Sequence, residues 1–240
     1  MIPDSPPPYG TIVFDCDSTL SGMEGIEELA RAAHASEIAR LTTDAMEGRI
    51  PLEAVFGKRL DLVRPSRSDV AAIGRLYVER AVSGAREVVR GLQGLGKRVV
   101  IVSGGLLPAV IELARALAID DVHAVDLRFG EDGSYAGFDP RSPLAHAGGK
   151  IEVLRAIAAR PGAGRVCFVG DGATDLEAAG EVARFVAYGG VVRRESVFAR
   201  ARITCASPDF RALVPLLLSE GEIATLSASR EHARRLRLPP

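Results

Sequence analysis

The sequence predicts an α/β fold: a doubly wound parallel sheet with an inserted helical cap and a small β-hairpin flap. Short apolar, β-branched runs recur along the chain and stop at polar or glycine-rich segments, as buried parallel strands do. Stretches with apolar residues at three- and four-residue spacing, typical of helices, lie between most of these runs. A long interval after the first run has only helical patterns, which indicates an insertion.

Four apolar runs are the expected strands of the sheet, at residues 11–14, 98–102, 165–169 and 184–187. The expected helices of the core lie at residues 84–95, 107–117, 149–159 and 174–179. Strand, loop and helix in repeated order predict a parallel sheet with helices on both faces. Ligands of such sheets bind at the carboxyl ends of the strands, where the polar loops converge.

Two segments break this alternation. Residues 21–83 contain no convincing strand, and we predict that they form the helical cap, which leaves 11–20 and 84–220 as the core. Within residues 124–139, Gly130-Glu-Asp-Gly133 separates two short apolar runs, which is the signature of a β-hairpin. We expect residues 1–10 to be a flexible leader, and residues 221–240 to be a tail that is either helical or disordered.

The composition excludes several classes of protein. The 30 basic and 31 acidic residues leave a net charge of -1, so no basic field indicates nucleic-acid binding. The cysteines, at positions 16, 167 and 205, lack CxxC spacing and indicate neither a disulfide framework nor a zinc site. No signal peptide and no apolar run of the ~18 residues that a membrane span needs is present. We expect a cytoplasmic protein, monomer or homodimer, whose partner is a small molecule.

Two acidic pairs follow apolar runs. Asp15 and Asp17 end the first run, and Asp171 and Asp175 lie in Gly-Asp-Gly-Ala-Thr-Asp after a later one. A lone D-x-D also fits an Asx-turn that caps a strand, so Asp15 and Asp17 alone do not establish a functional site. If both strands are central and adjacent, four carboxylates crowd one cleft and need a cation to neutralise them. Ligands that are all oxygen, with room for water, favour Mg²⁺.

Two further elements suit an anion. Ser103-Gly-Gly105 follows a strand, and its hydroxyl and backbone N–H groups can cradle an anion, although a simple strand-to-helix turn has the same composition. Lys150 stands at the head of a helix, where its charge opposes the helix macrodipole. A lysine there is better explained by a phosphate that it holds beside a nucleophile.

Four elements of the chain resemble, in order, the four motifs of the haloacid dehalogenase superfamily: residues 14–20, Ser103, Lys150 and residues 170–175. Members of this superfamily have a Rossmann-like core. The cap segments 24–29, 45–48 and 59–66, with 134–138 and 148–150, resemble phosphoserine phosphatases. The likeness runs from about residue 11 to 217. It implies Mg²⁺-dependent hydrolysis of O-phospho-L-serine to L-serine and phosphate, the last step of serine biosynthesis.

The resemblance also implies a role for each acidic residue. Asp15 would attack phosphorus and form an aspartyl phosphate. Asp17 would protonate the leaving serine oxygen and then activate the water that attacks the intermediate. Mg²⁺ would be held by the carboxylates of Asp15 and Asp171 and by the backbone carbonyl of Asp17. Asp175 would orient waters or Lys150 from behind these ligands.

The remaining implied roles concern the substrate. Ser103, the Gly104 N–H and Lys150 would hold the phosphoryl oxygens. Glu24 would pair with the ammonium group of phosphoserine, and Arg59 would clasp its carboxylate. Without the resemblance, both cap residues would be ordinary surface charges on helices.

Other positions carry less weight. Met46 matches an apolar position of the family's pocket, and Thr174 matches a polar contact near the substrate. Leu52 stands where the family often has phenylalanine, which could loosen the pocket. We expect Arg193 and Arg194, near a glycine pair, to be solvated residues at a helix start.

Two other functions remain open. A phosphatase of the same fold acting on another small phosphomonoester would be favoured if Arg59 did not face the catalytic aspartates. A catalytically idle phosphate-binding module, or a nucleotide-binding domain of Rossmann type, is disfavoured because no G-x-G-x-x-G follows the first strand.

Overall fold

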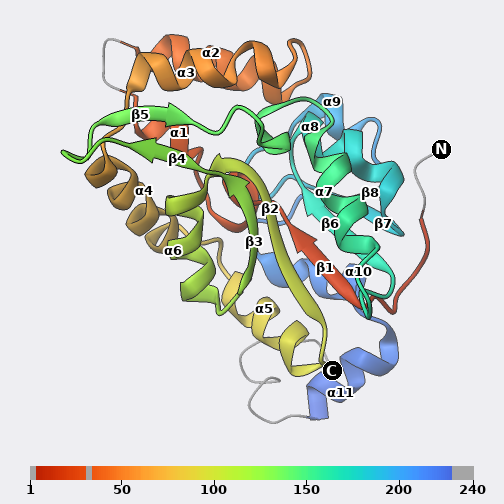
Figure 1. The fold of residues 1–240 in the computed structure, drawn as a ribbon. Coiled ribbons are helices and arrows are strands. Elements are labelled where there is room, and N and C mark those ends of the chain that lie inside the picture. The colour runs from red at the N-terminus through yellow and green to blue at the C-terminus, as the bar shows by residue number, and fades with distance from the viewer. Residues whose placement is uncertain (1–3, 31–33, 229–240) are drawn as a thin grey trace.

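The computed structural model describes residues 4–30 and 34–228, and a six-stranded parallel sheet forms its centre (Figure 1). The strands lie in the order β3-β2-β1-β6-β7-β8. Their bounds are β1 (Thr11–Phe14), β2 (Arg98–Leu106), β3 (Asp121–Val125), β6 (Val166–Gly170), β7 (Arg184–Tyr188) and β8 (Ile203–Cys205). Phe14, the last residue of β1, pairs with Ile101 on β2 and Val169 on β6. The segments that follow these three central strands therefore meet at one edge of the sheet.

Helices cover both faces of the sheet, as predicted. Figure 1 shows α5 (Ala85–Gly94) and α6 (Leu107–Leu117) on one side of the strands, and α7 (Gly149–Ala158) and α8 (Ala173–Glu177) on the other. Right-handed crossovers require this division, because the chain first builds the sheet outward from β1 through β2, and then in the opposite direction through β6. Short helices α9 (Glu195–Phe198) and α10 (Val214–Leu217) and the terminal α11 (Glu220–Ala228) complete the described core. No helix among the described residues is long and apolar enough to span a membrane.

The insertion after β1 is helical. It contains α1 (Gly25–Glu28), α2 (Ala35–Met46), α3 (Phe56–Val63) and α4 (Arg67–Glu79), and its α2 and α3 lie beyond the sheet at the top of the view (Figure 1). A single antiparallel bridge between Ser21 and Ala81 joins the two ends of this insertion where they meet the core. We call residues 21–83 the cap, although its bounds stay a prediction.

The hairpin flap is present as predicted. Strands β4 (Leu127–Phe129) and β5 (Tyr135–Phe138) pair antiparallel and form a separate two-stranded sheet. The ring of Phe138 lies edge-on to the ring of Phe56 on α3, with 5.1 Å between the ring centroids. The flap therefore helps to fix the position of the cap.

Several details differ from the predictions. The edge strands β3 and β8 were missed, because β3 is half-buried and carries polar residues and β8 has only three residues. Strand β2 runs on through the predicted glycine turn to Leu106. The predicted helix 174–179 is α8 followed by a 3-10 helix at Ala178–Glu181.

The two ends of the chain also differ from the predictions. In the predicted leader, Asp4 pairs with Arg184 and the ring of Tyr9 is buried, so residues 4–10 make defined contacts with the core. The tail is helical as far as Ala228, and its remainder, 229–240, lies outside the described residues.

Aromatic packing beneath β1 supports the edge of the sheet that carries the polar motifs. The ring of Phe210 lies 5.3 Å from that of Phe14 and 5.3 Å from that of Tyr188, measured between centroids. All three side chains are fully buried. Phe210 thus links the end of β1 to the end of β7.

Replacing Phe210 by alanine should lower the free energy of unfolding by about 3–5 kcal/mol, because the change leaves a cavity in a close-packed core. Chemical denaturation followed by circular dichroism measures this loss. The matched control is Val192→Ala at an exposed position, for which we expect a change below about 0.5 kcal/mol. Equal stability of the two variants would contradict the packing role of Phe210.

Candidate active site

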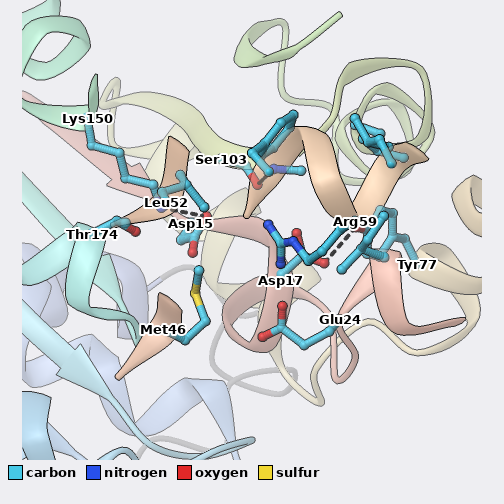
Figure 2. A pocket seen from close by; sticks show the side chains of 16 residues that line it. Asp15, Asp17, Glu24, Met46, Leu52, Arg59, Tyr77, Ser103, Lys150 and Thr174 are labelled. Atoms are coloured by element: carbon cyan, nitrogen blue, oxygen red, sulfur yellow. Dashed lines mark hydrogen bonds and ion pairs between the residues drawn. The ribbon is translucent and has the colours of Figure 1, made fainter. Parts of the chain in front are cut away.

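A single cleft between the strand ends and the cap gathers most of the predicted site residues (Figure 2). Its volume is about 600 Å³ including its open mouth, within the range usual for small-molecule sites. Nine predicted residues line it: Asp15, Asp17, Glu24, Met46, Arg59, Ser103, Gly104, Lys150 and Thr174. Leu52 is buried and also lines the cleft, at the position where we noted a departure from the family. The chain thus brings together residues from the core and from the cap.

Asp15 lies at the floor of the cleft, directly after β1. Its Oδ1 atom accepts a hydrogen bond from the Cys16 N–H at 2.8 Å and lies 3.0 Å from Nζ of Lys150. The chain then makes a tight turn in which Ser18 has a positive φ of 52°, and this turn directs Asp17 into the same cleft. Burial raises the pKa of Asp15 well above its usual range, and the charge of Asp175 raises it further, whereas Lys150 opposes the shift.

Lys150 is the cation nearest to Asp15. Its Nζ atom also lies 2.5 Å from Oδ1 of Asp175, whose Oδ2 accepts the Gly172 N–H at 2.8 Å. Burial alone would lower the pKa of Lys150, but the two carboxylates outweigh it and raise that pKa. Lys150 therefore stays cationic beside the candidate nucleophile, and Asp175 fixes its position.

Asp15, Asp171 and Asp175 form a cluster in which one carboxylate oxygen from each lies within 4.8 Å of the others. It is the only such potential metal-binding group found among the described residues. Burial raises the pKa of Asp171 to about 6, because the charged form is poorly solvated there. Three buried carboxylates form an all-oxygen donor set that suits a hard divalent cation.

The carboxylate of Asp17 is not a member of this cluster. Its Oδ1 atom accepts two hydrogen bonds from the cap: one from the Tyr77 hydroxyl at 2.6 Å (Figure 2), and one from the Gly25 N–H at 2.7 Å. Burial raises the pKa of Asp17, and these two hydrogen bonds partly oppose the shift. Sequence reasoning missed Tyr77, because its spacing from Val70 and Ile73 on α4 indicates only a buried helix face.

The segment that we predicted to cradle an anion lies at the end of β2. Ser103 is fully buried, and its Oγ accepts the Gly105 N–H at 2.9 Å. Both Gly104 and Gly105 line the cleft. A Cβ atom on Gly105 would lie 2.8 Å from Oδ2 of Asp17, so only glycine allows this close approach.

The cap supplies a buried guanidinium. Arg59 is 5% exposed, and its Nη1 donates to Oγ1 of Thr42 on α2 at 3.0 Å. Its Nε is buried without a hydrogen-bond partner among the described residues. Burial lowers the pKa of Arg59, while the charges of Glu24 and Asp17 oppose the shift. Figure 2 shows the side chain beside those two acids, so Arg59 faces the acidic side of the cleft.

The prediction for Arg194 was wrong. This residue is 5% exposed, and its guanidinium bridges two acids: Nε lies 2.9 Å from Oδ2 of Asp171, and Nη2 lies 2.9 Å from Oε1 of Glu24. Its neighbour Arg193 is exposed, as expected. The local sequence could not separate the two arginines, because the partners of Arg194 lie far away in the chain. A usable signal was its place after β7, at the sheet edge where the acidic residues collect.

Replacing Arg194 by methionine should lower the free energy of unfolding by about 3–5 kcal/mol in EDTA, because the buried carboxylate of Asp171 and the partly buried one of Glu24 lose their shared cation. The matched control is Arg193→Met, which changes an exposed neighbour and should cost below about 0.5 kcal/mol. Thermal and chemical unfolding of both variants measure the difference. A loss for Arg194→Met no larger than that for the control would show that the bridge contributes nothing to stability.

Comparisons with known proteins agree with this geometry. The family model described as haloacid dehalogenase-like hydrolase matches residues 12–180. The phosphoserine phosphatase of Bos taurus is 36% identical over 189 residues, which are 78% of this chain and 84% of that protein. The phosphoserine phosphatase of Homo sapiens is 36% identical over the same shares of both chains.

Solved structures show the same likeness. A substrate-bound phosphoserine phosphatase complex superposes with a TM-score of 0.77 at 27% identity, covering 88% of this chain and 99% of the other. A phospho-aspartyl intermediate analogue of phosphoserine phosphatase gives a TM-score of 0.75 at 28% identity, over 88% and 100% of the two chains. The chain therefore belongs to the haloacid dehalogenase-like hydrolases and, within them, to the phosphoserine phosphatase family.

Proposed function

We propose that this protein hydrolyses O-phospho-L-serine to L-serine and phosphate through an aspartyl phosphate on Asp15, as the last step of serine biosynthesis in the cytoplasm. The observation that carries the proposal is the pair of opposite charges that the cap adds to the cleft. Arg59 offers a buried guanidinium with an unpaired Nε, and Glu24 offers a carboxylate nearby. Together they complement the carboxylate and the ammonium group of a phosphorylated amino acid.

The residues present fit Mg²⁺. The ion would be held by the carboxylates of Asp15 and Asp171 and by the backbone carbonyl of Asp17. Asp175 would not contact the ion directly but would position Lys150, from which it accepts a hydrogen bond. When bound, Mg²⁺ supplies positive charge that offsets the repulsion between these carboxylates and the phosphoryl oxygens. The buried, crowded carboxylates support this assignment, because without a cation their mutual repulsion disfavours the ionised form.

The chain's own residues account for phosphoryl transfer. Asp15 would attack phosphorus while the bond between phosphorus and the serine oxygen breaks. Lys150, Ser103 and the Gly104 N–H would bind the phosphoryl oxygens and stabilise their charge. Asp17 would give its proton to the leaving oxygen, and would later take a proton from the water that hydrolyses the intermediate.

Residues of the cap would bind the carboxylate and the ammonium group of the substrate. Arg59 would bind the carboxylate through Nε and its remaining guanidinium N–H groups, and its bond to Thr42 would fix the plane of the group. Glu24 already accepts hydrogen bonds from Ser18 at 2.8 Å and from Arg194 at 2.9 Å through Oε1. The substrate ammonium would therefore pair with Oε2. Thr174 and Met46 would contact the substrate at the side of the cleft.

The first test is phosphate release from a panel of phosphomonoesters, measured with Mg²⁺ and again with EDTA. We expect a strong preference for L-phosphoserine and loss of activity in EDTA. The Asp15→Asn variant is the control, because its amide is nearly isosteric but a poor nucleophile, and it should be inactive yet folded. Activity spread evenly over other esters would instead favour the same-fold phosphatase with another substrate, and full activity of Asp15→Asn would refute the covalent mechanism.

Replacing Arg59 by alanine should lower kcat/KM for phosphoserine about 100-fold, because two charge-assisted hydrogen bonds to the carboxylate are lost. The same change should lower kcat/KM for p-nitrophenyl phosphate, which lacks that carboxylate, by less than about threefold. Lys58→Ala is the matched control, since Lys58 is the exposed neighbour on α3 and pairs with Glu37 at the surface. An equal decrease in kcat/KM for both substrates would show that Arg59 does not bind the substrate carboxylate.

A further inference from the structure

We infer that Tyr77, from the cap, is a positioning residue that holds Asp17 so that its Oδ2 atom faces the reacting phosphate. The inference rests on the proposed function in so far as Asp17 acts as acid and base there. The inference assigns a role to a residue that belongs neither to the four motifs of the core nor to the pair Glu24 and Arg59, which we propose bind the substrate's charged groups.

The two oxygens of Asp17 have different surroundings. Oδ1 accepts both the Tyr77 hydroxyl at 2.6 Å and the Gly25 N–H at 2.7 Å. Oδ2 has no hydrogen bond among the residues that the structure describes, and lies where a Cβ on Gly105 would approach it to 2.8 Å. Gly105 follows directly on Ser103 and Gly104, the candidate phosphate cradle. The free oxygen therefore points toward the phosphate, and the occupied oxygen points away from it.

The position of the Tyr77 hydroxyl is tightly restricted. The side chain is 1% exposed, so the ring has no room to turn toward solvent. A Cβ on Gly25 would lie 2.2 Å from the Tyr77 hydroxyl oxygen, so the glycine at the start of α1 provides the space that the hydroxyl occupies. Both donors to Oδ1 thus depend on the same close contact between α1 and α4.

Both donors belong to the cap, whereas Asp17 belongs to the core. They lie close to the place where the cap joins the core: Gly22 donates its N–H to the Arg80 carbonyl at 2.8 Å, and Val82 donates to the Leu20 carbonyl at 2.9 Å. Because the Tyr77 hydroxyl belongs to the cap and orients the carboxyl of Asp17, proton transfer by Asp17 depends on the position of the cap relative to the core. This dependence is the functional consequence of the contact.

The step that Tyr77 would assist is the departure of the alcohol. As the bond between Asp15 and phosphorus forms and the bond between phosphorus and the ester oxygen breaks, the proton on Oδ2 of Asp17 moves to that oxygen. The alcohol leaves neutral, and Asp17 remains as the carboxylate, with Oδ1 still bound to Tyr77. A poor leaving group such as an alkoxide needs this proton, whereas p-nitrophenolate leaves without it.

The test is Tyr77→Phe, which removes only the hydroxyl, assayed on alkyl phosphates (phosphoserine and β-glycerophosphate) and on p-nitrophenyl phosphate. We expect kcat/KM for the alkyl phosphates to fall at least about tenfold, a part of the gain that a well-placed general acid provides. The value for p-nitrophenyl phosphate should fall by less than about threefold, and the inhibition constant of inorganic phosphate should stay unchanged. The matched control is Tyr188→Phe, whose fully buried hydroxyl has no hydrogen-bond partner among the described residues; it should keep all three values.

Losses that are equal for alkyl and aryl phosphates, or no loss at all, would overturn the inference. A changed inhibition constant for phosphate would also overturn it, because Tyr77 would then shape the cleft rather than orient Asp17. The proposed function fails separately, in the unaltered protein, if phosphoserine is a poor substrate. The contrast between β-glycerophosphate and p-nitrophenyl phosphate tests Tyr77 even then.

Discussion

Mutual repulsion among buried carboxylates at the ends of β1 and β6 is the constraint on which the rest of the structure depends. Asp15, Asp171 and Asp175 lie within one small cluster, and burial raises the pKa of the first two. Lys150 and Arg194 each contact two acidic residues and offset part of this repulsion. A site that concentrates negative charge in this way is unfavourable for folding, and it makes sense as a place prepared for cations and for a phosphoryl group.

The parallel sheet makes this concentration possible. Since β1 pairs with both β2 and β6 in register, the candidate nucleophile Asp15, the serine loop and the second acidic pair leave the sheet at one edge. Lys150 then reaches the same place from the start of α7. The residues that we propose bind the phosphate and attack its phosphorus therefore all belong to the core. The cap adds Glu24 and Arg59 to the same cleft, which are the residues that we propose distinguish phosphoserine from other phosphomonoesters.

The sequence predicted the central strands, the helices on both faces, the helical insertion and the hairpin, because each has a strong periodic pattern or a turn signal of its own. It did not predict β3 and β8, since β3 is only half-buried and carries polar residues and β8 has only three residues. It placed the motif residues in one cleft because parallel strands end together. It failed for Arg194 and did not identify Tyr77, because the role of each side chain depends on partners that are distant in the sequence: Asp171 and Glu24 lie 23 and 170 positions from Arg194, and Asp17 lies 60 positions from Tyr77.

Those two residues have one property in common that bears on how the site works. Each joins a residue of the core's acidic site to the cap: Arg194 connects Asp171 to Glu24, and Tyr77 connects α4 to Asp17. Glu24 and Gly25 are adjacent in the chain, so both connections meet at the start of α1. A movement of this one turn would alter the carboxyl of Asp17, the candidate metal cluster and the candidate ammonium site together. If Glu24 binds the substrate and Asp17 transfers the proton, as we propose, these contacts at the first turn of the cap couple substrate recognition to catalysis.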